Sequence, residues 1–176
     1  MRIKMYSMKK LFFAIIVLNL FLAACSSQKK VSDHLPTVDL LDQQRYTFVA
    51  RQVIPTEDAQ YNPRNMFPNA SNMYQLTSRY DLRITPDSVV AYLPFFGRAY
   101  TAPINPSEGG IKFTSTNFSY KISMRKKNYE IQIIPNDNND VRNLYLTVSP
   151  SGYASLNITS VNKTPIGYSG VIESNQ

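Results

Sequence analysis

Apolar and polar residues alternate along most of the chain after residue 74. Over residues 74–84, one face collects Tyr, Leu, Ser, Tyr, Leu and Ile, and the residues between them are Gln, Thr, Arg, Asp and Arg. A period of two is typical of a strand with one buried face. Residues 85–88 (T-P-D-S) predict a turn, because proline fixes φ and short polar side chains bond neighbouring amides. Residues 89–93 are then expected to return as a partner strand.

The same pattern continues to the end of the chain. Upstream, residues 38–45 predict a short helix with Val38 and Leu41 inward and Leu40 as a third candidate for that face. Residues 46–50 are rich in strand formers, and the prolines and asparagines of 54–71 predict a long irregular crossover. Strands at near-regular spacing with short turns predict an all-β domain, an antiparallel meander curled into a barrel or a sandwich, with a short N-terminal helix. Further strands are predicted over 111–113, 118–125, 129–134, 141–148, 153–159 and 166–172, with turns at 126–128, 135–140 and 149–152.

The first thirty residues follow a different pattern. Basic residues precede a largely apolar run over 11–22, which is too short for a bilayer core that takes about 20 apolar residues. Such a run followed by small residues predicts a secretory signal peptide. The small residues lead directly to Cys25, the only cysteine of the chain. Leu22-Ala23-Ala24-Cys25 resembles the lipobox of bacterial lipoproteins, in which the signal is cut before a cysteine that carries lipid.

The lipobox resemblance divides the chain into a signal peptide over 1–24, a tether over 25–37 and a single β-rich domain over 38–176. The tether is small, polar and proline-containing, and about 140 residues remain, enough for one core. The alternative for Cys25 is an ordinary buried or tail cysteine. Several acyl chains, at about 0.8 kcal/mol per buried CH₂, hold a protein far more firmly than one chain.

Lipidation implies a water-soluble body anchored by its lipid to the bacterial outer membrane. No acidic pair closely follows Cys25, whereas the tethers that send such lipoproteins to the cell surface are acid-rich. A periplasm-facing orientation is therefore expected.

Removal of the signal peptide also changes the charge of the protein. The whole chain carries +7 at pH 7, with 19 basic and 12 acidic residues. Four basic residues leave with residues 1–24, so 15 basic residues remain against 12 acidic ones, a net charge of +3. This mild excess is spread along the chain and gives little support to a nucleic-acid partner. The expected partners are a membrane, reached through the lipid, and an envelope protein or a small ligand.

Residues for catalysis and metal binding are scarce. His34 is the only histidine and lies in the predicted tether, so a Ser-His-Asp, Cys-His or histidine metal site has almost no basis. The acidic residues are scattered, and no facing pair of carboxylates is evident. Residues 135–140 (P-N-D-N-N-D) look like a calcium loop, but an EF-hand starting at Asp137 would place Val141 at a ligand position, so a polar hairpin turn is expected. We expect no enzymatic activity, no cofactor and no bound metal.

The stretch 93–100 (L-P-F-F-G-R-A-Y) is dense in aromatic residues. Pro94 cannot donate to a sheet, and Gly97 allows a bulge or a positive φ, so strand pairing must lapse there. In one reading the chain turns a corner that aromatic side chains fill, and the arginine pairs with a carboxylate or with carbonyls. In the other, the same side chains contact a ligand or partner. The candidate contact residues are Phe95, Phe96, Arg98 and Tyr100.

Two phrases carry a family resemblance. Residues 87–100 (D-S-V-V-A-Y-L-P-F-F-G-R-A-Y) and 151–160 (S-G-Y-A-S-L-N-I-T-S), followed by P-I-G-Y-S-G at 165–170, resemble the bacterial lipoprotein family catalogued as domain of unknown function 4251, over about residues 45–172. The resemblance implies a secreted lipoprotein with a β-rich domain and supplies no catalytic residue. Asp87-Ser88-Val89 is in addition similar to an O-glycosylation site that some bacteria use on such lipoproteins, which makes Ser88 a candidate modification site.

The sequence favours two functions. The first is a lipid-anchored, non-enzymatic β-domain that binds a partner or supports an envelope assembly. The second is a carrier or sensor of a small apolar or amphipathic ligand in a barrel cavity, and an enzyme comes third. An apolar cavity of about 300 Å³ or more would favour the carrier, whereas a filled core with an exposed aromatic patch would favour the partner-binding domain.

Overall fold

The computed structural model describes residues 36–55, 74–101 and 109–175. They form one helix, α2 (Pro36–Asp42), and nine strands. The strands are β1 (Tyr46–Pro55), β2 (Gln75–Ile84), β3 (Val89–Leu93), β4 (Ile111–Ser115), β5 (Phe118–Arg125), β6 (Asn128–Pro135), β7 (Val141–Val148), β8 (Tyr153–Ser160) and β9 (Ile166–Ser174).

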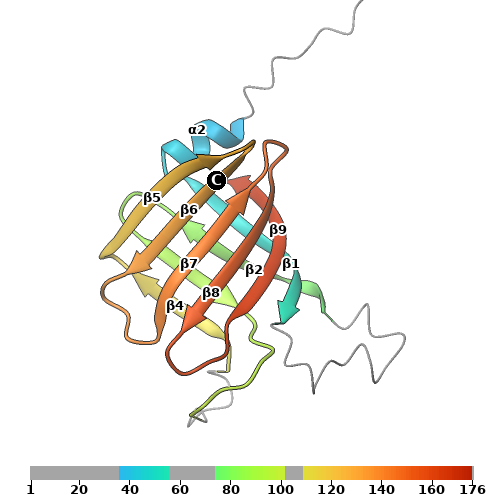
Figure 1. The fold of residues 1–176 in the computed structure, drawn as a ribbon, viewed down its shortest axis with the longest axis vertical. Coiled ribbons are helices and arrows are strands. Elements are labelled where there is room, and N and C mark those ends of the chain that lie inside the picture. Colours follow the sequence, from blue (N-terminus) through green and yellow to red (C-terminus); the bar gives the residue numbers. More distant parts are fainter. Residues whose placement is uncertain (1–35, 56–73, 102–108, 176) are drawn as a thin grey trace, which may run out of the picture. The chain divides into compact units, whose positions relative to one another are not determined.

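All nine strands belong to one antiparallel sheet with the order β4-β3-β2-β1-β9-β8-β7-β6-β5. β1 pairs with both β2 and β9, and so joins the first four strands to the last five. Figure 1 shows the sheet curling over itself, with β5–β8 crossing in front of β1–β4. β4 and β5 end the order without pairing to each other. The predicted all-β meander with a short N-terminal helix is confirmed, and it takes the form of a nearly closed barrel.

The helix is shifted from its predicted range of 38–45, because it begins at Pro36 and ends at Asp42. Gln44 has a φ of 54°, in the left-handed region, and its N–H donates to the Leu41 carbonyl at 3.2 Å. The Arg45 N–H donates to the Leu40 carbonyl at 3.0 Å. These two bonds form a Schellman motif, which satisfies the last helical carbonyls and stops the helix.

The strands were predicted more accurately than the helix. β1 continues to Pro55, beyond the predicted end at residue 50 and into the expected crossover. The rest of that crossover, from residue 56, lies outside the described residues. A bulge between Ala50 and Gln52 lets β1 stay paired with β9 as far as Pro55.

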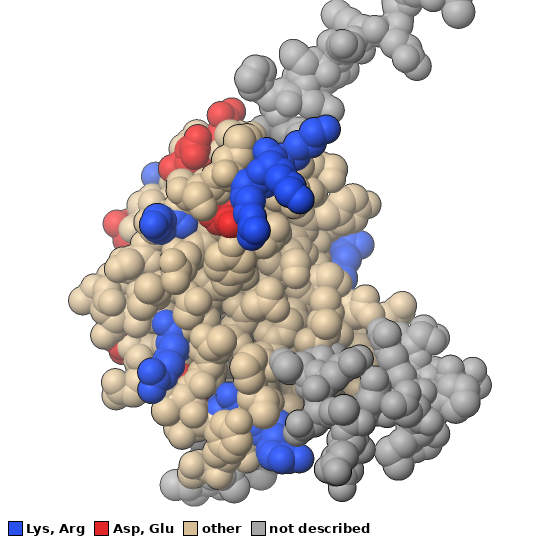
Figure 2. Space-filling view, in the orientation of Figure 1, with Lys and Arg blue, Asp and Glu red and all other residues tan. Residues whose placement is uncertain are grey.

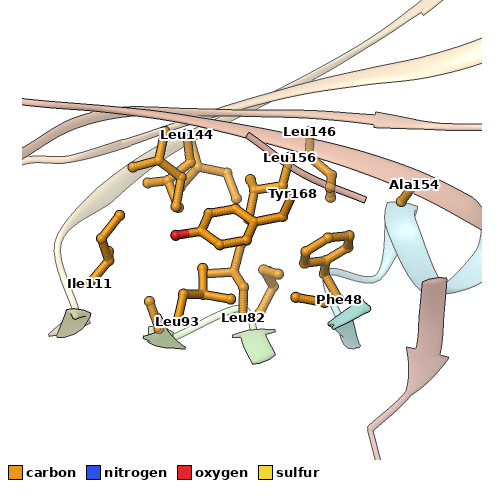
Figure 3. Close-up of a cluster of buried hydrophobic side chains, with 14 of the residues drawn as sticks. Phe48, Leu82, Leu93, Ile111, Leu144, Leu146, Ala154, Leu156 and Tyr168 are labelled. Atoms are coloured by element: carbon orange, nitrogen blue, oxygen red, sulfur yellow. The ribbon is translucent and has the colours of Figure 1, made fainter. Parts of the chain in front are cut away.

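Large apolar side chains fill the inside of the barrel. In Figure 3, Phe48 and Leu82 lie on one side and Leu146 and Leu156 on the other, with the ring of Tyr168 between the two sides. All five side chains are fully buried. Burying a side chain of this size contributes about 1.5–3 kcal/mol, so the contact between the two halves of the sheet is a main source of stability.

The unpaired ends of the sheet are joined by a short connection between β4 and β5. Asp137, in the β6–β7 turn, holds this connection with its carboxylate, which accepts hydrogen bonds from Ser115 Oγ, from the Thr116 N–H at 2.8 Å and from the Asn117 N–H at 3.1 Å. The bond from Ser115 and those from the two amides lower the pKa of Asp137 to about 2. The predicted polar turn at 135–140 is confirmed, and its first acidic residue binds the strand corner.

α2 lies at one end of the barrel, which we call the α2 end (Figure 1). Leu41 is fully buried in the core, and Tyr120 Oη of β5 donates to its carbonyl oxygen at 3.1 Å. Tyr120 Oη also lies 3.2 Å from Tyr46 Oη of β1. Burial raises the pKa of Tyr120 to about 12 and raises that of Tyr46 as well. The helix is thus fixed to the barrel through a pair of neutral phenols, of which Tyr46 is buried and Tyr120 half-buried.

Candidate functional site

The candidate site is the segment that follows β3, residues 94–101, which we call the β3 loop. It lies at the end of the barrel opposite the α2 end, together with the connection between β8 and β9 (Figure 1). Leu93, the last residue of β3, is buried and pairs with Ile111 of β4. Pro94 then ends the strand, because it has no N–H to donate.

The backbone of the β3 loop is held at several points. Tyr168 Oη donates to the Pro94 carbonyl oxygen at 2.6 Å. Ala99 forms an isolated antiparallel bridge with Lys163 in the β8–β9 connection. Around this bridge, the Thr164 N–H donates to the Arg98 carbonyl at 3.0 Å, and the Tyr100 N–H donates to the Asn162 carbonyl at 2.8 Å. The loop is therefore a short strand-like segment docked on the β8–β9 connection.

The three aromatic side chains of the loop differ in exposure. Phe95 is half-buried and packs against the core, whereas Phe96 is 45% exposed and Tyr100 is 68% exposed. The reading in which aromatic side chains fill a corner is therefore wrong for Phe96 and Tyr100. The reason is that the loop leaves the sheet and pairs with residues 162–164, so only its first aromatic residue reaches the core.

Gly97 has a different role from the one predicted. Among the described residues, the glycine with positive φ is Gly152, so Gly97 does not bend the chain through the left-handed region. A Cβ at Gly97 would lie 2.6 Å from Thr164 Oγ1 and 2.7 Å from Cζ of Phe95. Glycine is needed here because the loop approaches the β8–β9 connection too closely for a side chain.

A salt bridge supports the connection to which the loop docks. Lys163 Nζ lies 2.6 Å from Asp140 Oδ2, and the lysine side chain is only 16% exposed. The Val161 N–H also donates to the Asp140 carbonyl at 2.8 Å. Arg98 is exposed, and its N–H donates to Thr164 Oγ1 at 3.2 Å. The β3 loop, the β8–β9 connection and the β6–β7 turn thus form one hydrogen-bonded surface.

Sequence comparison assigns the chain to a family. A family model described as Domain of unknown function (DUF4251) matches residues 30–172. The chain belongs to the DUF4251 family. The match includes α2, the β3 loop and almost all of the nine-stranded sheet. No curated protein and no solved structure gives a significant match. The family description assigns no activity, so the role of the β3 loop has to be argued from its geometry.

The other predicted positions are distributed over the DUF4251 chain. Ser88 lies half-buried in the β2–β3 turn, where its Oγ is 2.9 Å from Thr85 Oγ1 and its N–H donates to the same oxygen at 2.9 Å. Cys25 and His34 lie outside the described residues. Over 36–55, 74–101 and 109–175, no helix has the length and apolar character needed to cross a membrane, and no three His, Cys, Asp or Glu side chains come together as metal ligands.

A second exposed aromatic group was missed in the sequence. Tyr92 of β3 is 48% exposed and stacks on Tyr80, with ring centroids 5.7 Å apart. Lys112 Nζ of β4 lies 4.9 Å from the centroid of the Tyr92 ring, in the geometry of a cation–π contact. Tyr92 lies between the buried residues Ala91 and Leu93, so the alternation of the strand indicated an outward side chain. Which side chains lie beside Tyr92 depends on how β3 pairs with β2 and β4, and the sequence does not show this register.

Proposed function

We propose that this DUF4251 protein is a lipid-anchored envelope lipoprotein whose β-domain acts without catalysis, by binding a partner or supporting an envelope assembly. The observation that carries the proposal is the exposure of Phe96 and Tyr100 on a backbone bonded to residues 162–164. Aromatic side chains on an ordered scaffold provide a large contact area at low entropic cost, and they are common among residues that dominate binding energy.

The filled interior supports partner binding over a carrier function. A ligand carrier needs a cavity of several hundred Å³ lined with apolar side chains. Here Phe48, Leu82 and Leu93 from one half of the barrel pack in one cluster with Leu144 and Leu156 from the other, around the Tyr168 ring (Figure 3). Contact with a partner outside the barrel is therefore favoured over a ligand inside it.

The lipid anchor rests on the Leu-Ala-Ala-Cys sequence that ends at Cys25. The chain enters the described domain at Pro36, the first residue of α2. The β3 loop lies at the other end of the barrel from α2 (Figure 1). In a protein anchored at Cys25, the exposed aromatic residues of the β3 loop would extend into the envelope space, where another protein can reach them.

Site-specific photo-crosslinking in intact cells tests partner binding. A photoreactive amino acid in place of Tyr100 is expected to give a discrete protein adduct, and Phe96→Ser in the same chain should reduce it strongly. The matched control is the same photoreactive residue at Lys121, which is exposed in β5 and belongs to neither the β3 loop nor the residues bonded to it. Identical adduct patterns at Tyr100 and Lys121, or no adduct at Tyr100, would contradict the proposal.

A further inference from the structure

Basic side chains gather at the α2 end, on the tip of the β5–β6 hairpin. Arg125 ends β5, and Lys126 and Lys127 form the turn before β6. All three are exposed, and Figure 2 shows Lys and Arg side chains collected over this tip. Arg125 lies 3.6 Å from the carboxylate of Glu130. Lys126 and Lys127 lie at the very tip of the hairpin, between the last residue of β5 and the first residue of β6. Their charges are therefore farther from the barrel than that of Arg125.

Exposed apolar side chains accompany these charges. Met124, beside Arg125, is 64% exposed, and Tyr153 in the neighbouring β7–β8 hairpin is 69% exposed. The two hairpin tips lie at the same end, because Tyr129 of β6 pairs with Val148 of β7. Tyrosine is enriched at membrane–water interfaces, and lysine and arginine are attracted to anionic lipid surfaces. The combination has the chemistry of a surface that contacts lipid headgroups.

Both hairpin tips lie close to the point where the tether enters the domain. A Cβ at Gly152 in the β7–β8 turn would lie 3.7 Å from Thr37 Oγ1 of α2. The β5–β6 tip lies beside this turn, because Tyr129 of β6 pairs with Val148 of β7. α2 begins only eleven residues after Cys25. A fully extended chain spans about 3.3–3.6 Å per residue, so this tether reaches at most about 40 Å. A lipid on Cys25 therefore keeps the hairpin tips near the bilayer surface.

We propose that Met124, Arg125, Lys126, Lys127 and Tyr153 form a lipid-facing tip, which rests on the membrane and binds the phosphates of anionic lipid headgroups. The proposal rests on the lipid anchor of the proposed function and adds an orientation to it. Asp39 and Asp42 are exposed on α2, so the helix is repelled by an anionic surface and the contact centres on the hairpins. Charge attraction extends only about 8 Å at physiological ionic strength, so basic residues far from the tip contribute little.

Fluorescence quenching in vesicles tests this orientation. In the mature lipoprotein the thiol of Cys25 carries lipid, so a cysteine introduced elsewhere can be labelled alone. One fluorophore is placed by Ser151→Cys in the β7–β8 turn, and the matched control by Asn139→Cys in the exposed β6–β7 turn at the other end. The lipidated full-length mature protein is reconstituted into phosphatidylcholine vesicles with or without phosphatidylglycerol, each with a headgroup-attached quencher. Thermal melts confirm that the variants fold.

The fluorophore at residue 151 is expected to be quenched several-fold more than that at 139 when phosphatidylglycerol is present. Lys126→Gln with Lys127→Gln should remove most of this difference, as should high salt. The control pair Arg51→Gln with Arg142→Gln changes exposed arginines outside the tip and should leave it intact. Equal quenching of the fluorophores at 151 and 139 would overturn the lipid-facing tip. So would quenching at 151 that is the same with and without phosphatidylglycerol and is unchanged by the two lysine substitutions.

The N-terminal mass of the mature protein separates this proposal from the one beneath it. A mature N-terminus without acyl groups would overturn the lipid anchor and the lipid-facing tip together. An acylated N-terminus without preferential quenching at 151 would overturn the tip alone and leave the anchor in place.

Discussion

The hydroxyl of Tyr168 donates a hydrogen bond of 2.6 Å to the carbonyl oxygen of Pro94. Tyr168 is fully buried at the centre of the core, and Pro94 is the first residue of the β3 loop. The bond therefore joins a fully buried aromatic side chain of the core to the segment that carries the exposed aromatic residues. Burial raises the pKa of Tyr168, so the phenol stays neutral and remains a donor.

Tyr168→Phe should destabilise the domain by about 1 kcal/mol, since the change keeps the ring and leaves a half-buried carbonyl without its donor. Urea unfolding of the two proteins measures the difference. Tyr153→Phe is the matched control, because its side chain is exposed and its loss of a hydroxyl should have little effect. Equal unfolding midpoints for wild type and Tyr168→Phe would show that the bond to Pro94 adds nothing to stability.

The paired phenols of Tyr46 and Tyr120 predict a loss of stability in alkaline solution. Burial raises the pKa of Tyr120 to about 12 and raises that of Tyr46, so both stay neutral in the folded state. In the unfolded chain they ionise near pH 10. The unfolded state therefore loses protons first, so the contribution of the two phenols to the free energy of unfolding should be constant below about pH 10 and fall above it.

Tyr120→Phe tests the contribution of this phenol pair. The variant should be less stable at pH 8, because it lacks the bond to the Leu41 carbonyl, and its stability should decrease less steeply above pH 10. Tyr100→Phe is the control, since Tyr100 is 68% exposed. Denaturant unfolding across pH 8–11 gives both quantities. A slope above pH 10 that Tyr120→Phe leaves unchanged would contradict the assignment.

The period of two predicted the strands because burial of alternate residues is decided locally. It could not predict that β1 lies between β2 and β9, and this pairing distinguishes a barrel from a sandwich. The end of β1 at Pro55 was hidden for a similar reason, because prolines signal a break and only the partner β9 shows that pairing continues there.

The candidate site was predicted in its residues and only partly in its geometry. An aromatic-rich loop after β3 was evident from its composition. The exposure of Phe96 and Tyr100 depends on hydrogen bonds to residues 162–164, more than sixty positions away in the chain. The basic hairpin tip was also evident as R-K-K, but its position near α2 follows from the pairing of Tyr129 with Val148 and from the closeness of the Gly152 turn to Thr37. Long-range contacts of this kind leave no periodic pattern in the sequence.

The Schellman motif after α2 predicts a stabilising substitution. Gln44 has a φ of 54°, a conformation that is unfavourable for residues with a Cβ and that glycine adopts without strain. Gln44→Gly should therefore stabilise the domain by up to about 1 kcal/mol. Gln43→Gly, one residue earlier, is the control and should destabilise it, because glycine adds only unfolded-state entropy there. Thermal melts of the two variants should shift in opposite directions, and a lower melting temperature for Gln44→Gly would contradict the prediction.

The carboxylate of Asp137 predicts the behaviour of the domain in acid. Its hydrogen bonds from Ser115, Thr116 and Asn117 hold its pKa at about 2, against an ordinary value of 3.8. A carboxyl whose pKa is lowered by folding stabilises the folded state above its unfolded pKa, and this contribution is lost as the pH falls through the folded pKa. Wild-type stability should therefore decrease between about pH 4 and pH 2, as the β4–β5 connection loses its acceptor.

Asp137→Asn isolates this effect. The amide keeps the size of the side chain but cannot accept the same set of bonds as a carboxylate, so the variant should melt at a lower temperature than wild type at pH 7. Its melting temperature should also fall less between pH 4 and pH 2. Asp87→Asn provides the control, because Asp87 is exposed in the β2–β3 turn. If Asp137→Asn and wild type lose stability in parallel on acidification, the β4–β5 corner is held by contacts other than this carboxylate.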